Sequence, residues 1–185
     1  MSKDFNKKTT EKLLMVTRNS QTTPDDIMEL IEQGADVNAK NEYGMTPLMW
    51  AAENSSNPDA IKVLIDNGAD VNAKDNYGKG GTALMFAIGH NPTLEVIINL
   101  IEHGADVNVK DNDGWTPLIW ATKYSSNPEI IKMLIDNGAD VNAKDNDGRN
   151  ALNYARKPEI AEILKEAMKQ KTSVQEQEEY TDVSL

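Results

Sequence analysis

Gly34-Ala35-Asp36-Val37-Asn38 is the first of four copies of one pentapeptide, which returns at positions 68, 104 and 138. The copies are spaced by 34, 36 and 34 residues. A longer string of twelve residues occurs whole at Ile65–Asn76 and again at Ile135–Asn146. Self-similarity at a fixed period of about 20–50 residues is typical of stacked-repeat proteins. The sequence therefore predicts a solenoid, in which neighbouring units cover each other's apolar faces.

Each unit reads as two helices followed by a turn. Thr46 suits the position before a helix and Pro47 its first position, because the threonine hydroxyl accepts a backbone N–H that proline does not need. Pro58 begins the second helix, and Gly68 ends it because glycine adopts the left-handed conformation at little cost. The polar, glycine-bearing segment 71–78 suits a turn.

Three strings mark the start of the first helix in successive units, each followed by a GADVN block. They are Thr46-Pro47-Leu48-Met49, Thr82-Ala83-Leu84-Met85 and Thr116-Pro117-Leu118-Ile119. These motifs resemble those of the ankyrin-repeat family over roughly residues 9–168. The resemblance implies an all-α repeat solenoid of helix–turn–helix units joined by β-turn fingers. It also implies about three full repeats between two capping repeats.

Three features depart from the family pattern. Met49, Met85 and Ile119 stand where the family has histidine, so the hydrogen bonds of that histidine are in question. The units are 34 residues long rather than about 33, with the extra residue in the turn between the helices. The two residues added to the 36-residue spacing are assigned to Lys79-Gly80-Gly81, which lengthens one finger.

The expected domain boundaries follow the repeats. A polar segment over residues 1–8 precedes a repeat domain over 9–168, and an acidic tail over 169–185 is expected to be disordered because it has few apolar residues. The repeat domain divides into an N-terminal cap (9–44), full repeats (45–78, 79–114 and 115–148) and a C-terminal cap (149–168). Charged residues in both caps fit the polar end repeats that solenoids need.

Composition excludes several classes of function. The 185 residues carry 30 acidic and 19 basic side chains, a net charge of −11. This balance argues against nucleic-acid binding and against docking on anionic lipid. The absence of cysteine excludes disulfides and thiolate zinc sites. We expect a cytoplasmic protein, since no apolar run has the length of a signal peptide or membrane span; secretion by a route without a signal peptide stays open. The polar caps favour a monomer.

Two acidic turns, 111–114 and 145–148, are similar in sequence to the start of a calcium-binding loop. However, a calcium loop needs an oxygen ligand at its first position, where the count places Val109 and Ala143. Gly78-Lys79-Gly80-Gly81-Thr82 lacks the order of residues found in a phosphate-binding loop. These segments are interpreted as repeat turns and as an extended finger.

The two histidines also favour structural roles. His90 lies where the family often has a Gly-His turn, and His103 precedes the glycine that ends a helix, where a cation is favourable. No nucleophile is paired with either. We therefore expect no enzymatic activity, no cofactor and no metal.

Two series of aromatic residues remain. Trp50, Phe86, Trp120 and Tyr154 occupy one position in successive units, and they form either part of the core or a binding ladder. Tyr43, Tyr77 and Trp115 lie in finger turns and Tyr124 at the end of a first helix. The resemblance places such positions on a concave, partner-binding face. Aromatic side chains are enriched at binding hot spots, although these four could also cover neighbouring fingers.

The candidate partner-binding residues are Tyr43, Met45, Glu53, Tyr77, Lys79, His90, Asp113, Trp115, Lys123, Tyr124 and Arg149. The expected function is a non-enzymatic protein-binding module, a scaffold or adaptor, whose partner carries a basic or amphipathic segment. An effector or inhibitor that blocks an enzyme is the alternative, and an enzyme with an acidic site is a third hypothesis.

Overall fold

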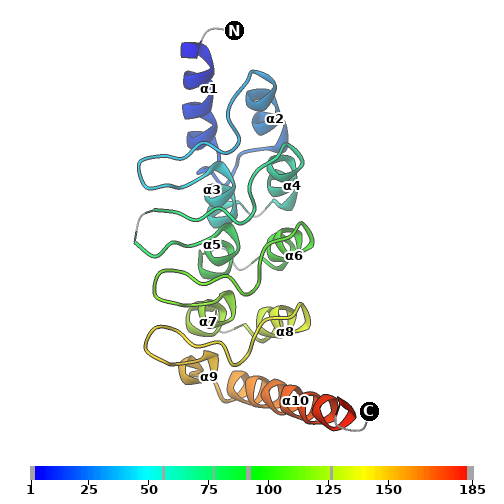
Figure 1. Ribbon diagram of the computed structural model, residues 1–185. Coiled ribbons are helices and arrows are strands. Elements are labelled where there is room, and N and C mark those ends of the chain that lie inside the picture. The colour runs from blue at the N-terminus through cyan, green and yellow to red at the C-terminus, as the bar shows by residue number, and fades with distance from the viewer. Residues whose placement is uncertain (1–2, 56, 77, 91–92, 126, 183–185) are drawn as a thin grey trace.

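A computed structural model describes residues 3–55, 57–76, 78–90, 93–125 and 127–182, with side chains from Asn6 to Lys171 in those ranges. The helices, in order, are α1 (Lys3–Val16), α2 (Pro24–Glu32), α3 (Pro47–Asn54), α4 (Pro58–Asp66), α5 (Ala83–His90), α6 (Leu94–Glu102), α7 (Pro117–Trp120), a π-helical turn η1 (Ala121–Ser125), α8 (Pro128–Asp136), α9 (Ala151–Tyr154) and α10 (Pro158–Asp182). Odd-numbered helices form one column and even-numbered helices a second, and the fingers project beyond the first column (Figure 1). The described residues include no strand, so the predicted all-α solenoid is confirmed.

The helices begin where the sequence predicts. The Thr46 hydroxyl accepts a hydrogen bond from the Met49 amide (3.2 Å), and Pro47 fills the first helical position. The second helix of this unit begins at Pro58 and is capped by the Asn57 side chain, which accepts from the Asp59 amide (2.9 Å). These caps satisfy amide groups that a helix start leaves without partners. The boundaries are therefore fixed by local chemistry.

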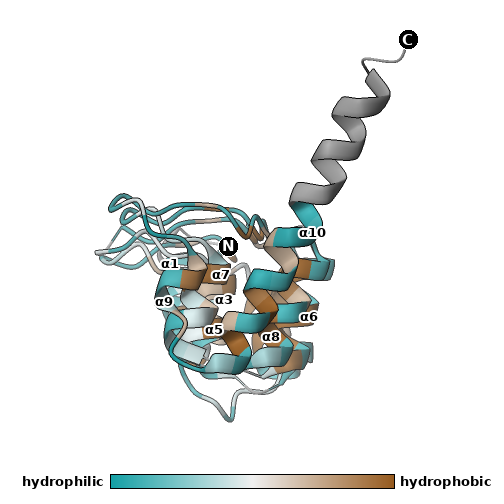
Figure 2. Ribbon diagram, turned by 90° about the horizontal axis from the view of Figure 1, so that it is seen from below, coloured by the Kyte–Doolittle hydropathy of each residue, from teal (hydrophilic) through white to brown (hydrophobic). Residues whose placement is uncertain are grey.

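The core lies between the two columns of helices, where the ribbon is hydrophobic when seen along the stack (Figure 2). Ala51 and Ala52 are buried, and their small side chains permit close helix packing. Met49, Met85 and Ile119, which replace the family's histidine, are also buried. The structure therefore fills that position with apolar volume. In one unit the Met49 sulfur accepts a hydrogen bond from the Thr46 amide (3.4 Å).

Asparagine side chains join successive units. The Asn72 amide group donates to the Gly104 carbonyl (2.9 Å), and its oxygen accepts from the Asp106 amide (2.8 Å). Asn38 and Asn108 make the same pair of bonds to the units that follow them. The repeated GADVN block thus supplies the polar link between one repeat and the next.

Backbone hydrogen bonds between fingers correct the position of the two additional residues. The bonds run from Asn76 N to Tyr43 O (3.0 Å), from Asn112 N to Lys79 O (2.6 Å) and from Asn146 N to Asp113 O (3.0 Å). Lys79 therefore occupies the place of Tyr43 and Asp113, and the additional residues precede it instead of lying in Lys79-Gly80-Gly81. The sequence misplaced them because Gly78 and Gly80 match the repeating glycine equally well.

Both ends of the chain differ from expectation. Helix α1 begins at Lys3, so most of the segment 1–8 continues into the first unit. Helix α10 runs to Asp182, where disorder was expected from residue 169. Its Lys, Glu and Gln residues are strong helix formers and no proline or glycine interrupts them. At the start of this extension, Lys171 Nζ lies 2.9 Å from Asp140 Oδ1.

Candidate functional site

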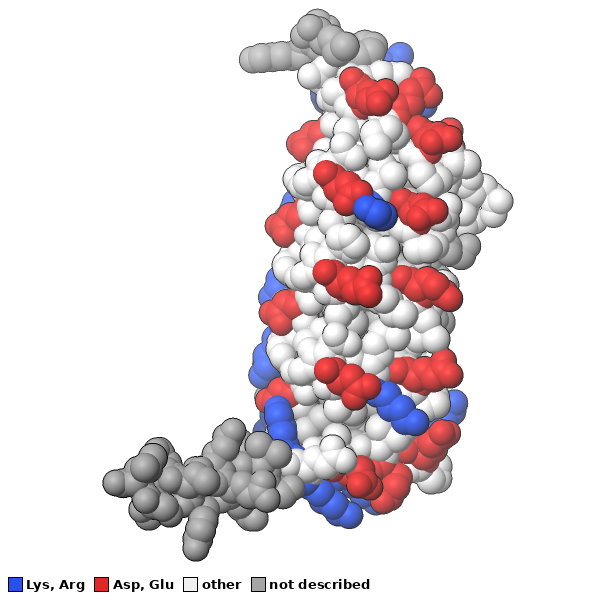
Figure 3. All heavy atoms as spheres, turned by 90° about the vertical axis from the view of Figure 1, so that its right-hand side faces the viewer, with Lys and Arg blue, Asp and Glu red and all other residues white. Residues whose placement is uncertain are grey.

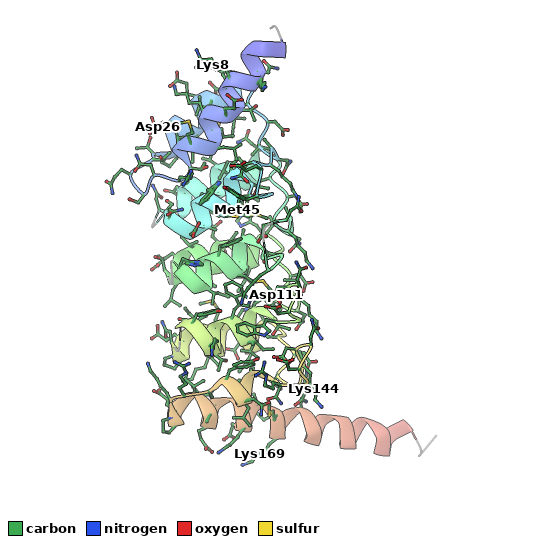
Figure 4. The ribbon with its side chains drawn as sticks, turned by 90° about the vertical axis from the view of Figure 1, so that its left-hand side faces the viewer. Lys8, Asp26, Met45, Asp111, Lys144 and Lys169 are labelled. Carbon is green, nitrogen blue, oxygen red and sulfur yellow. The ribbon has the colours of Figure 1, made fainter. Side chains whose placement is uncertain are left out.

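The fingers project from one side of the solenoid, and Met45 of the predicted binding set lies on that side. Figure 4 faces this side, and the labelled Met45, Asp111 and Lys144 follow one another along it in the order of their units. Tyr43 is 41% exposed and Tyr124 is 47% exposed, whereas Met45 is buried. The prediction for Tyr77 lies outside the described residues.

Four aromatic rings, from Trp115, Trp120, Tyr124 and Tyr154, form a cluster near the C-terminal end of this side. The ring of Trp115 lies 5.1 Å from that of Tyr154 and 5.8 Å from that of Tyr124. The rings of Trp120 and Tyr124 are 5.1 Å apart, edge to face. These distances and tilts are favourable for aromatic pairs. We call this group the aromatic cluster.

Lys79 reaches the aromatic cluster from the preceding finger. Its Nζ lies 4.5 Å from the centre of the Trp115 ring and 5.9 Å from that of Trp120. It also lies 3.5 Å from Asp113 Oδ2 and 3.5 Å from the Tyr124 hydroxyl. Burial by itself lowers the pKa of Lys79, but Tyr124 and Asp113 outweigh it and raise the pKa overall. Lys79 is therefore a cation held over aromatic rings.

Two more cations contact Tyr154 in the same cluster. Lys123 Nζ lies 5.5 Å from the centre of its ring, and the Arg149 guanidinium carbon lies 5.1 Å from it. Arg149 also pairs with the carboxylates of Asp145 (Nε to Oδ2, 3.5 Å) and Asp147. Lys123 and Tyr124 both belong to the π-helical turn η1, a rare geometry that is frequent at functional sites.

Two pockets open on this side, and we number them from the N-terminus. The second pocket, of about 270 Å³, lies beside the aromatic cluster. It is lined by Lys79, Gly89, His90, Trp120 and Tyr124. The His90 ring stacks on Phe86 with 6.1 Å between ring centres, and its Nδ1 lies 4.0 Å from Glu53 Oε1. The structure therefore brings His90 and Lys79 to one cavity.

Another pocket of about 270 Å³, the first pocket, lies nearer the N-terminus, where α3 and α5 meet the finger residues. Its lining consists of Tyr43, Met45, Trp50, Glu53, Asp75 and Phe86. Three of the predicted binding residues, Tyr43, Met45 and Glu53, thus surround one cavity. Three others, Lys79, His90 and Tyr124, line the second pocket.

The opposite side of the solenoid has a different character. Figure 3 shows Asp and Glu side chains in rows along the outer surface of the even-numbered helices. These exposed residues are Asp59 and Asp66 on α4, Glu95 and Glu102 on α6, and Glu129 and Asp136 on α8. Much of the negative charge therefore lies away from the aromatic cluster.

A family model described as ankyrin repeats (3 copies) matches residues 2–75, 57–145 and 84–177. The chain belongs to the ankyrin-repeat family. Ankyrin repeats are generally protein–protein interaction modules. No curated protein matches the sequence. No helix in the described ranges of this ankyrin-repeat protein combines the length and apolar character needed to cross a membrane.

Four contributors to the pockets and to the aromatic cluster of this ankyrin-repeat protein were missing from the set predicted from sequence. Trp120 and Tyr154 are buried, as expected of core residues. Their rings also pack against those of Tyr124 and Trp115 in the cluster. Trp50 and Phe86 are half-buried and line the first pocket. The signal was present in the sequence, because aromatic residues occupy this one position in four successive units.

The buried finger aspartates serve the turns. Asp111 Oδ1 accepts from the amides of Asp113 (2.9 Å) and Trp115 (2.8 Å), and Asp145 does the same in the next finger. Burial by itself raises the pKa of Asp145, but the hydrogen bond from Tyr154 and those from backbone amides lower it overall. No three His, Asp or Glu side chains in the described part of the chain are grouped to hold a metal ion.

Proposed function

We propose that this chain is a non-enzymatic protein-binding module, a scaffold or adaptor, that uses the finger side as its binding surface. The observation that carries the proposal is the partly exposed aromatic cluster with Lys79, Lys123 and Arg149 around it. Tyrosine, tryptophan and arginine are the residues most enriched at binding hot spots. The repeat domain of residues 9–168 is the proposed binding unit.

The proposed partner is a protein with a basic or amphipathic segment. Its basic residues would complement the carboxylate of Glu53 at the first pocket, and its apolar residues the exposed rings of Tyr43 and Tyr124. The absence of cysteine is in keeping with a reducing cytoplasm, which is the proposed location. The polar capping units support a monomer.

Affinity capture from a lysate of the cells that make the protein tests this function. The full chain is compared with a Lys79→Ser, Tyr124→Ser double variant, whose changed side chains are partly or largely exposed. An Ile98→Ser variant is the matched control, because Ile98 is 38% exposed on α6, away from the fingers. Circular dichroism verifies that all three proteins are folded.

The proposal predicts a partner that the wild type and the Ile98→Ser variant retain and that the double variant loses. Retention by the double variant, with loss by the Ile98→Ser variant, would place the binding surface on the outer helices. If mass spectrometry finds no protein enriched by the wild type, the chain is not a protein-binding module under these conditions and the proposal fails.

A further inference from the structure

We propose that the first pocket binds a basic side chain, arginine or lysine, presented by the protein partner. This inference rests on the proposed function and assigns one recognition element within it. The pocket combines the rings of Tyr43, Trp50 and Phe86 with the carboxylate of Glu53. A cation gains from the faces of aromatic rings within about 6 Å and forms strong hydrogen bonds with a carboxylate.

The described residues that line the first pocket include neither lysine, arginine nor histidine. Two nitrogen-bearing side chains lie close to it. The Arg18 guanidinium carbon is 4.5 Å from the centre of the Trp50 ring, and His90 Nδ1 is 4.0 Å from Glu53 Oε1, but neither residue lines the cavity. The second carboxylate, that of Asp75, is buried and accepts the Gly81 amide (2.8 Å), so it is engaged in its own finger. Glu53, with 23% of its side chain exposed, is the carboxylate available at the pocket wall.

Equivalent positions in successive repeats can be compared to infer which side chain the first pocket binds. The finger hydrogen bonds make Tyr43, Lys79 and Asp113 equivalent, and Glu53, Gly89 and Lys123 each lie seven residues after the threonine that opens their first helix. The first pocket thus has Tyr43 and Glu53 at these two places, without a cation. In the next interval between successive repeats, Lys79 occupies the place of Tyr43 and lies over Trp115 and Trp120. In the interval after that, Lys123 occupies the place of Glu53 and lies over Tyr154.

In two successive intervals, therefore, the chain places its own ammonium group over aromatic rings on the finger side. In the first interval the two equivalent places hold the Tyr43 ring and the Glu53 carboxylate, so a carboxylate stands where the later interval has Lys123. A cation supplied from outside would complete the pattern. The volume of about 270 Å³ leaves room for one long basic side chain.

Nuclear magnetic resonance titration of the full chain tests the proposal with defined probes. The probes are N-acetyl-arginine methylamide and its lysine counterpart, with the neutral glutamine and norleucine methylamides as controls. The indole N–H signals of Trp50, Trp115 and Trp120 report on both pockets within one sample. The Glu53→Gln variant removes the carboxylate without changing its shape, and Glu95→Gln removes an equal charge from the exposed outer surface of α6.

We expect the arginine and lysine probes to shift the Trp50 signal in a saturable way, with a dissociation constant on the order of millimolar because a single side chain makes few contacts. Glu53→Gln should weaken binding about tenfold, as expected for the loss of a charge-assisted hydrogen bond, whereas Glu95→Gln should leave it unchanged. A lysine response as large as the arginine response supports the same proposal, since both side chains carry the cation.

Three results would overturn the inference. One is an equal shift of Trp50 with the norleucine or glutamine probe, which would make the pocket an apolar or neutral site. Another is a cationic shift confined to Trp115 and Trp120, and the last is the absence of any shift at Trp50. None of these results bears on whether lysate proteins bind the finger side, so failure of the pocket and failure of the binding module remain distinguishable.

Discussion

The indole nitrogen of Trp120 donates a hydrogen bond to Asp111 Oδ2 over 2.8 Å, and both residues are buried. Asp111 is in the finger and Trp120 ends helix α7, nine residues later. The Tyr154 hydroxyl makes the equivalent bond to Asp145 in the next unit. Trp120 and Tyr154 therefore pack against the core and also tie α7 and α9 to the fingers that precede them.

Removing the hydroxyl of Tyr154 should destabilise the C-terminal end of the solenoid. We expect Tyr154→Phe to lower the free energy of unfolding by about 1.5–3 kcal/mol, the usual contribution of a hydrogen bond to a charged group. The matched control is Tyr124→Phe, because the exposed Tyr124 hydroxyl is 3.5 Å from Lys79 Nζ. That control should change stability by less than about 0.5 kcal/mol. Urea unfolding followed by circular dichroism measures both, and equal losses would contradict the prediction.

The same hydrogen bond predicts an alkaline loss of stability. Burial, followed by the hydrogen bond to the Asp145 carboxylate, raises the pKa of Tyr154 to about 12. An unfolded tyrosine ionises near pH 10, so the contribution of Tyr154 is complete below that pH and is lost as the pH rises toward the folded value. The stability gap between the wild type and Tyr154→Phe should therefore narrow above about pH 10. Unfolding curves over this range would contradict the prediction if the gap stayed constant.

The asparagine links between repeats can be tested with an internal control. Asn72→Ala removes two hydrogen bonds to the next unit, so we expect a loss of about 1–3 kcal/mol. Asn142 occupies the same place in the last full repeat, which no GADVN block follows. Asn142→Ala should therefore cost less than about 0.5 kcal/mol. The difference between the two urea midpoints is the measurement, and a reversed order would show that the links do not stabilise the stack.

Two glycines with similar backbone angles should differ in their tolerance of alanine. Gly68 has φ +88° and open space where a Cβ would lie, so Gly68→Ala should cost about 1–2 kcal/mol from the left-handed conformation alone. Gly44 has φ +75°, and a Cβ there would lie 2.4 Å from the backbone nitrogen of Asn76 in the next finger. Gly44→Ala should therefore lower the melting temperature further than Gly68→Ala does. Equal shifts would mean that the fingers move apart freely.

The contact between Lys171 and Asp140 should be visible by titration but should contribute little to stability. The hydrogen bond from Lys171, the largest influence, lowers the pKa of Asp140. Because the folded pKa is lowered, the contribution is present above the unfolded pKa and is lost as the pH falls. Lys171→Gln should return the pKa of Asp140 toward its usual value and change stability by less than about 1 kcal/mol.

Nuclear magnetic resonance of the Asp140 carboxyl carbon follows this titration. Lys165→Gln is the control, because Lys165 pairs with Glu162 within α10. If Lys171→Gln leaves the titration of Asp140 unchanged, α10 does not hold this contact in solution.

Local signals in the sequence were sufficient for the helices and their order. Thr46, Pro47 and Asn57 specify helix starts through groups within three residues of themselves, so no knowledge of the rest of the fold was needed. The same local reasoning failed for the tail, where charge suggested disorder but helix propensity over residues 169–182 favoured a continued α10. It also failed to choose between Gly78 and Gly80, because both fit a turn and only pairing between fingers distinguishes them.

The period of 34 to 36 residues, the capping residues and the apolar faces determined a stacked helical solenoid, because each depends on chemistry within one unit or on its repetition. The site depended on the tertiary structure. Lys79, Trp115 and Tyr154 come from three different units, and Glu53 meets Tyr43 and Phe86 only when neighbouring repeats stack. Whether an aromatic ring lies beside a cation or a carboxylate is decided by contacts between units, since the rotation from one repeat to the next sets which side chains meet.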